Sequence, residues 1–300
     1  MGNSILRDCG LGKTTDEFAS QIVTKGKTYY VSKQGNNGGG NTWENAYTTL
    51  AAAITASNTY VATYTNVWNI IYVDGGNYTE SLVEFPNHCK VIGVGVPSDG
   101  PRVNGSVVLT SSPSVCHFYN MQFRTNTNAP IVDMSDVTAQ GVEFQDCLFN
   151  CTSGVQATYG LVFGSANYYN KIIGCTFAGN PSMTHAIHLE GPENGFMDIR
   201  DNQISAVTTG ILVAGWGAGI GYSDYQLWIR NNVICRTDPN SGSQLTTGIN
   251  FADTQSRSHA MVVHNWIAAG TPITGHNTSC TIENHVQTAG NGLVLVEEGT

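Results

Sequence analysis

Three observations on the sequence predict a right-handed parallel β-helix, an all-β fold in which short strands coil around one core. A unit of the form apolar–x–x–(Asn or small)–x–apolar recurs at nearly constant spacing. A second set of short apolar segments, several entered through Gly, alternates with that unit. Charged residues make up only 12% of the chain, while Gly is abundant at 34 residues. This composition favours short strands joined by tight turns, because Gly and Asn tolerate positive φ.

The recurring unit sets the register of the predicted coils. Its successive centres are separated by 27, 26, 28, 27, 30, 33 and 19 residues. A nearly constant spacing with two longer steps indicates coils of similar length, two of which carry loop insertions. The last, short step indicates a truncated final coil. We expect about eight coils, centred on Val94, Met121, Cys147, Cys175, Asn202, Asn232, Asn265 and Asn284.

The last four centres are Asn residues, and this pattern has a physical reason. Neighbouring coils of a β-helix lie about 4.8 Å apart, the spacing of paired strands. A buried Asn at a corner therefore reaches the equivalent Asn above and below, as amides do in stacked β-structures. Asn also tolerates the left-handed backbone that a sharp corner needs. Cys147 and Cys175 extend this column. We expect reduced thiols, because the eight cysteines show no metal-like spacing.

Both ends of such a solenoid need cover. At the N-terminal end, Asn41 and Glu44 look like a capping box that opens an amphipathic helix over residues 41–54. At the other end, an apolar strand at residues 292–296 would cover the last coil. We therefore expect an N-terminal arm, a capping strand–helix–strand region, the β-helix, and a C-terminal strand and tail, at residues 1–27, 28–80, 81–286 and 287–300.

Charge and hydropathy exclude several classes of function. The net charge is −9, and only 13 Lys and Arg residues are spread over the chain, whereas nucleic-acid binding needs clustered basic residues. No apolar run approaches the length of a membrane span, and the first residues lack the apolar core of a secretory signal. We therefore expect neither nucleic acid nor a membrane as a partner, and release within an assembled particle rather than secretion.

Outward-facing positions of the coils bring together a charged cluster. Strand side chains alternate between two faces, so with Ile199 inward, Asp198 and Arg200 point outward. The same register stacks these flanking positions of neighbouring coils into two columns. The first column holds Glu143, Lys171, Asp198, Trp228 and Met261, and the second holds Gln145, Ile173, Arg200, Arg230 and Val263.

Two interpretations of the charged cluster stay open. As a catalytic site, Glu143, Lys171, Asp198, Arg200 and Arg230 are the candidate residues. As a structural feature, the same residues form a ladder of ion pairs, each contributing a few tenths of a kcal/mol. Because basic residues equal or outnumber acidic ones, the pattern favours the ladder over a calcium site.

A further set of residues has two interpretations, a solvated loop, which the sequence favours, or a contact with carbohydrate. Inserted loops on one side of a solenoid often form its binding surface, and the longest insertions here carry several polar side chains. An outward aromatic ring also suits stacking on a sugar or packing at a subunit interface. His185 and His188 are three apart on a strand, so we expect them to point to opposite faces and to hold no metal. The candidate carbohydrate-binding residues are Trp228, Asp253, Arg257 and His259.

The N-terminal region resembles the opening of a known superfamily. It contains Tyr30-Val-Ser, Gly40-Asn-Thr-Trp43, Ala46-Tyr, Leu50, Ala53-Ile54 and Ile71-Tyr-Val-Asp-Gly-Gly-Asn-Tyr-Thr-Glu80. This stretch and the coils after it, to residue 286, are similar to pectate-lyase-like right-handed β-helix proteins. The resemblance implies the fold but no single function, because that superfamily holds polysaccharide lyases, glycoside hydrolases, pectin esterases, phage tailspikes and non-enzymatic virion proteins.

Two functions remain as expectations. The first, which the sequence favours, is a structural or adhesive protein of a virus particle, such as a capsid decoration, fibre or tailspike-like protein. It would be a homotrimer without a cofactor, would bind other virion proteins through residues 1–27, and would contact a surface glycan through its lateral face. The second is an extracellular polysaccharide lyase or glycoside hydrolase that acts on an acidic glycan, with Ca²⁺ as the cofactor of a lyase.

Overall fold

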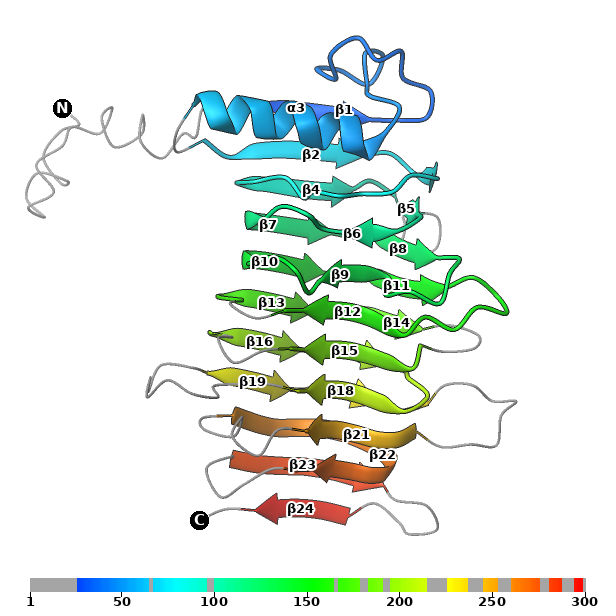
Figure 1. Ribbon diagram of the computed structural model, residues 1–300, viewed down its shortest axis with the longest axis vertical. Coiled ribbons are helices and arrows are strands. Elements are labelled where there is room, and N and C mark those ends of the chain that lie inside the picture. The colour runs from blue at the N-terminus through cyan, green and yellow to red at the C-terminus, as the bar shows by residue number, and fades with distance from the viewer. Residues whose placement is uncertain are drawn as a thin grey trace, which may run out of the picture.

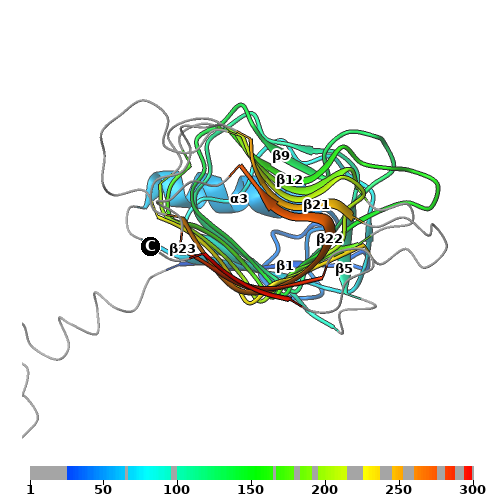
Figure 2. The same cartoon turned by 90° about the horizontal axis from the view of Figure 1, so that it is seen from below.

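The chain folds as a right-handed parallel β-helix, as the repeat predicts. Figure 1 shows the coils stacked along the long axis, with a helix across the end nearest the N-terminus. In Figure 2, viewed along that axis, the strands superpose from coil to coil around one core. The computed structural model describes residues 26–64, 67–95, 100–164, 167–178, 183–190, 195–214, 226–236, 245–252, 260–275, 281–287 and 294–298.

Up to three strands per coil give the solenoid three faces. The first face contains β1 (Thr28–Val31), β2 (Asn69–Val73), β4 (Cys89–Gly93), β7 (Ser114–Tyr119), β10 (Gln140–Gln145), β13 (Asn170–Ile173), β16 (Met197–Arg200) and β19 (Leu227–Arg230). The second contains β3 (Gly76–Tyr78), β5 (Pro101–Asn104), β8 (Gln122–Thr125), β11 (Leu148–Cys151), β14 (Thr176–Ala178), β17 (Gln203–Ile204) and β20 (Val233–Ile234). The third contains β6 (Val107–Val108), β9 (Val132–Met134), β12 (Tyr159–Phe163), β15 (His185–Leu189), β18 (Thr209–Val213) and β21 (Leu245–Phe251).

Strand pairing confirms the predicted register. Each first-face strand pairs in parallel with its equivalent in the next coil, from β1 as far as the long strand β22 (Ala260–Thr274), which runs through all three faces. Strand β23 (Thr281–Gln287) continues the stack. Val94 directly follows β4, and Asn265 and Asn284 lie within β22 and β23. The other predicted centres each lie two residues after a strand of this series, at the corner that leads to the second face: Met121, Cys147, Cys175, Asn202 and Asn232.

The predicted amide ladder runs along the corner between the first and second faces. Asn202, Asn232, Asn265 and Asn284 are all buried. The Nδ2 of Asn232 donates to the Oδ1 of Asn265 at 2.8 Å and to the backbone oxygen of Ile199 at 3.0 Å. Its Oδ1 accepts from the side chain of Asn202 at 2.9 Å and from the backbone N–H of Asn202 at 3.0 Å. The amides of Asn202, Asn232 and Asn265 thus each tie their own coil to both neighbours.

The left-handed backbone at this corner falls one residue earlier than expected. We had assigned it to the ladder residues, but the residues directly before them take positive φ instead, for example 60° at Asp201 and 56° at Asn231. The ladder amide must face inward, so the preceding exposed residue makes the turn. Asn, Asp, His and Gly tolerate this conformation best. The positions concerned are Asn120, Asp146, Gly174, Asp201, Asn231 and His264.

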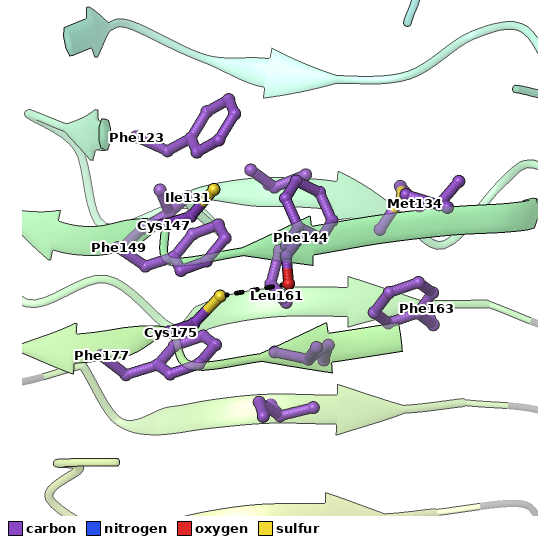
Figure 3. Packing of buried hydrophobic residues seen from close by; sticks show 14 of the residues in the cluster. Phe123, Ile131, Met134, Phe144, Cys147, Phe149, Leu161, Phe163, Cys175 and Phe177 are labelled. Carbon is purple, nitrogen blue, oxygen red and sulfur yellow. Dashed lines mark hydrogen bonds between the residues drawn. The ribbon is translucent and has the colours of Figure 1, made fainter. Parts of the chain in front are cut away.

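Stacked aromatic rings fill the core between the faces. Phe149 lies on Phe123 with centroids 5.4 Å apart and on Phe177 at 4.8 Å, with planes within 12° (Figure 3). Cys175 occupies the ladder column above Asn202, and its Sγ donates to the backbone oxygen of Phe144 at 3.4 Å (Figure 3). The described cysteines, Cys89, Cys116, Cys147, Cys151, Cys175 and Cys235, are all free, as expected.

The capping helix exists, but the predicted capping box is wrong. Asn41 and Glu44 lie in a loop, and the helix α3 runs over Leu50–Thr63 with Thr49 as its N-cap. Trp43, assigned to the helix, is 42% exposed in that loop. The Oγ1 of Thr49 accepts the backbone N–H of Ala52 at 3.3 Å.

A tertiary contact determines where α3 begins. The carboxylate of Glu80 accepts from the backbone N–H groups of Leu50 and Ala51 at 2.9 and 2.8 Å. A carboxylate at a helix N-terminus satisfies unpaired donors and complements the helix dipole. The helix then buries Ala53 and Ile54 against the first coils, so it covers the open end of the core, as expected.

The opposite end is covered by an antiparallel strand. Strand β24 (Val294–Glu298) pairs antiparallel with β23, and it is the last strand in Figure 1. It lies close to the apolar segment predicted to cover the last coil. Most of the expected N-terminal arm, residues 1–25, lies outside the described part of the chain.

We predict that Asn232→Ala lowers the free energy of unfolding by about 3 kcal/mol, because it leaves several buried partners of the Asn232 amide unsatisfied. Urea unfolding followed by circular dichroism measures the change. The exposed Gln203→Ala serves as the control and should cost less than about 0.5 kcal/mol. Equal costs for the two variants would show that the ladder does not stabilise the fold.

Candidate functional site

The predicted charged cluster forms on the outer side of the first face. Glu143 pairs in register with Lys171, Lys171 with Asp198, and Asp198 with Trp228. The second column is also as predicted, with Arg200 beside Arg230. We call this surface the lateral face. It consists of His117, Tyr119, Glu143, Lys171, Asp198, Arg200, Trp228 and Arg230.

Asp198 lies at the centre of the ion pairs in the part of the lateral face nearer the C-terminus, which contains Arg200, Trp228 and Arg230. Its side chain is only 7% exposed. Arg200 donates through Nε to Oδ2 of Asp198 at 3.1 Å. Arg230 donates through Nε to Oδ1 at 3.2 Å and through Nη2 to Oδ2 at 3.0 Å. The Nη1 of Arg200 donates to Oδ2 of Asp201 at 2.9 Å. Two guanidinium groups thus share one buried carboxylate, a strong charge-assisted arrangement.

These contacts leave the arginines poorly suited to act as a base. The hydrogen bond to Asp198 raises the pKa of Arg230, and the charges of Asp198 and Asp201 act in the same direction. Arg230 also lies 5.4 Å from the ring centroid of Trp228, and Phe196 packs edge-on against that ring at 5.1 Å. The indole ring of Trp228 thus lies between the Phe196 ring and the Arg230 guanidinium.

The part of the lateral face nearer the N-terminus contains two residues that the sequence did not reveal, His117 and Tyr119. Tyr119 donates to Oε1 of Glu143 at 3.3 Å, and its hydroxyl lies 3.3 Å from Nδ1 of His117. Lys171 lies 3.5 Å from the same carboxylate. Burial and the neighbouring Glu143 raise the pKa of Tyr119 to about 12, and burial lowers the pKa of His117. Extending the predicted columns by one coil would have found both residues.

A second polar cluster lies on the third face, where the expectation for the histidines is wrong. His185 and His188 do not point to opposite faces, because both rings stack on Tyr159, with centroids 5.3 and 4.6 Å apart. Alternation breaks between them, since the intervening Ala186 and Ile187 are both buried in the core. The partner strand β12 does the same at Gly160 and Leu161, where a Cβ on Gly160 would meet the backbone oxygen of Ala186 at 2.5 Å.

The imidazole of His188 is buried and incompletely satisfied. Its side chain is 7% exposed, and Nδ1 lies 3.1 Å from Oε1 of Glu190 without hydrogen-bond geometry. Burial, with a smaller effect of His185, lowers the pKa of His188 to about 4. Burial and the charges of Asp133 and Asp136 raise the pKa of Glu190. The imidazole is therefore neutral at physiological pH.

The remaining candidates are distributed as follows. Asp253, Arg257 and His259, the predicted carbohydrate-binding loop residues, lie outside the described part of the chain. Among the residues that the structure describes, no group of three His, Cys, Asp or Glu side chains is placed to hold a metal ion. Within the same residues, no helix is long and apolar enough to cross a membrane.

Comparison with known proteins gives a likeness of fold. No family model matches the sequence, and no curated protein matches it. A solved pectin methylesterase mutant, in complex with a hexasaccharide, is similar to this chain with a TM-score of 0.47 and 12% sequence identity. The match covers 90% of this chain and 85% of the enzyme. The likeness carries no information about residues or activity, and the assignment of the fold rests on the strand pairing described above.

We predict that Asp198→Asn destabilises the protein by about 2 kcal/mol, because two arginines lose a buried counter-ion. The matched control is Asp201→Asn. The carboxylate of Asp201 is 43% exposed and forms an ion pair with Arg200. Its replacement should therefore lower the free energy of unfolding by about 0.5 kcal/mol or less. Chemical unfolding at pH 7 measures both values, and a reversed order would contradict the central role of Asp198.

We predict an acid-dependent loss of stability from His188. Because its pKa falls from 6.5 in the unfolded chain to about 4 in the fold, the unfolded state takes up the proton first as the pH drops. The loss begins near pH 6.5, grows to about 3 kcal/mol, and levels off below about pH 4. Unfolding curves of the wild type and His188→Gln between pH 7 and 4 isolate this contribution. Parallel pH profiles would contradict it.

Proposed function

We propose that this protein is an adhesive β-helix that binds a polysaccharide along its lateral face without cleaving it. The observation that carries the proposal is the sharing of Asp198 by Arg200 and Arg230, which leaves neither the carboxylate nor the guanidinium groups free to transfer a proton. The lysine of the face is likewise close to a carboxylate, at 3.5 Å in the Lys171–Glu143 pair.

The surface chemistry supports binding to sugars. The indole of Trp228 is held by Phe196 and Arg230, and an aromatic ring fixed in this way stacks on a sugar at little cost in conformational entropy. Guanidinium planes offer hydrogen-bond donors to sugar hydroxyls, and the Tyr119 oxygen can accept a hydrogen bond from one. Successive coils repeat at about 4.8 Å, so the face presents a regular series of such contacts along the solenoid axis.

We further propose that the protein is part of a virus particle, as a homotrimer. Buried free cysteines suit assembly in a reducing compartment, and the low charge of the chain suits self-association. Multi-angle light scattering of the purified full chain measures the oligomeric state. A stable trimer supports this part of the proposal, and a monomer at micromolar concentration contradicts it.

We predict that Trp228→Ala weakens binding of the cognate polysaccharide about tenfold, equivalent to about 1.4 kcal/mol, because a stacking surface is lost. The matched control is Trp266→Ala, since Trp266 is 36% exposed on the second face. Affinities come from biolayer interferometry on a panel of capsular and uronate polysaccharides.

The same samples are assayed for new reducing ends and unsaturated products. Release of either product by the wild type, with loss on Asp198→Asn, would overturn the adhesive proposal in favour of a lyase or hydrolase. Binding that Trp228→Ala and Trp266→Ala reduce equally would place the contact elsewhere than on the lateral face.

A further inference from the structure

Two arginines on the outer side of the second face have no carboxylate partner among the residues that the structure describes. Val103 and Phe123 point into the core, so their flanking residues Arg102 and Arg124 point outward from the adjacent strands β5 and β8. The pairing places Arg102 beside Gln122 and Asn104 beside Arg124. Arg102 and Arg124 are therefore diagonal neighbours in the register of β5 and β8, the strands at the right of Figure 1.

Asparagine side chains flank Arg124 on both sides. Asn104 precedes it in the column and Asn150 follows it on β11. The Oδ1 atoms of both asparagines and the Nε of Arg124 are buried, and none of the three has a hydrogen-bond partner in the described structure. Buried polar atoms left unpaired are costly, and in native proteins they point to an absent water, ion or ligand.

The lateral face shows what such an arginine pair binds. There, Arg200 and Arg230 also lie on adjacent strands, and the protein supplies the carboxylate of Asp198 between them. No Asp or Glu among the described residues forms an ion pair with Arg102 or Arg124. Arg102 instead donates through Nε to Oε1 of Gln122 at 3.0 Å.

The second face thus holds the cations of such a site without the anion. Two like charges on neighbouring strands repel each other, so an anion bound between them would be stabilised by both. Guanidinium groups bind carboxylate, sulfate and phosphate through paired N–H donors. The flanking Asn oxygens accept hydrogen bonds, which suits a ligand that also carries hydroxyl groups.

We propose that Arg102 and Arg124, with Asn104 and Asn150, form a binding site for an oxyanion: a carboxylate, sulfate or phosphate group of a ligand. The site is separate from the lateral face, so a result on polysaccharide binding at the lateral face neither supports nor contradicts it. The ligand supplies the negative charge that Asp198 supplies on the other face.

Isothermal titration of the full chain tests this proposal. The titrants are sodium sulfate, inorganic phosphate and glucuronate, with uncharged glucose as the comparison, at constant ionic strength because exposed charges are screened by salt. We expect saturable binding of at least one anion and none of glucose. Tighter binding of glucuronate identifies an acidic sugar as the ligand, and tighter binding of sulfate or phosphate identifies an esterified group.

Three variants show where the anion binds. Arg124→Gln should weaken binding at least tenfold, whereas the exposed Lys90→Gln, which removes the same charge from the first face, should leave it unchanged. Asn150→Asp places a carboxylate beside Arg124, and it should abolish binding while raising the melting temperature.

The outcomes that overturn the proposal are equally specific. They are absence of saturable binding by the wild type, equal losses in Arg124→Gln and Lys90→Gln, or unchanged affinity in Asn150→Asp. Circular dichroism checks the fold of each variant, and Arg102→Gln replaces Arg124→Gln if the latter is unfolded. The polysaccharide affinity of the same variants, measured separately, keeps the two proposals distinguishable.

Discussion

The buried amide column holds successive coils in one register. An Asn at the corner has its hydrogen bonds satisfied only when the next coil places its own Asn at the same height, because both the oxygen and the nitrogen of Asn232 bond to neighbouring coils. A coil displaced by one residue would bury an unpaired amide and turn every side chain to the opposite face. The columns on the outer faces therefore follow from the same constraint that orders the core.

Stacking at a fixed spacing also determines the electrostatics of the surface. Residues of equivalent position become close neighbours, so like charges meet unless the sequence alternates them. On the lateral face, opposite charges interleave, and Asp198 lies between two arginines. On the second face, Arg102 and Arg124 are neighbours, and no carboxylate in the described part of the chain pairs with either. The same geometry thus gives one face that is internally neutralised and another that retains positive charge in a chain of net charge −9.

Prediction succeeded where the repeat and strand alternation both hold. The columns through Glu143, Lys171 and Asp198 followed from these two rules, and the structure has the same register. Prediction failed where a tertiary contact overrides a local signal. The helix begins at Leu50 because Glu80 binds its first N–H groups, and Glu80 lies too far along the chain for a local capping pattern to reveal it.

The sequence by itself determined the fold class, the spacing of the coils and the residues that share a column, because a periodic pattern of apolar and amide residues suffices to specify stacked coils. Only the tertiary structure decided which of those residues are paired. It brought His185 and His188 onto one ring of Tyr159, since the intervening Ala186 and Ile187 both turn inward. It also showed Asp198 neutralised and Arg124 unpaired, because pairing depends on side-chain positions across coils, which a repeat does not encode.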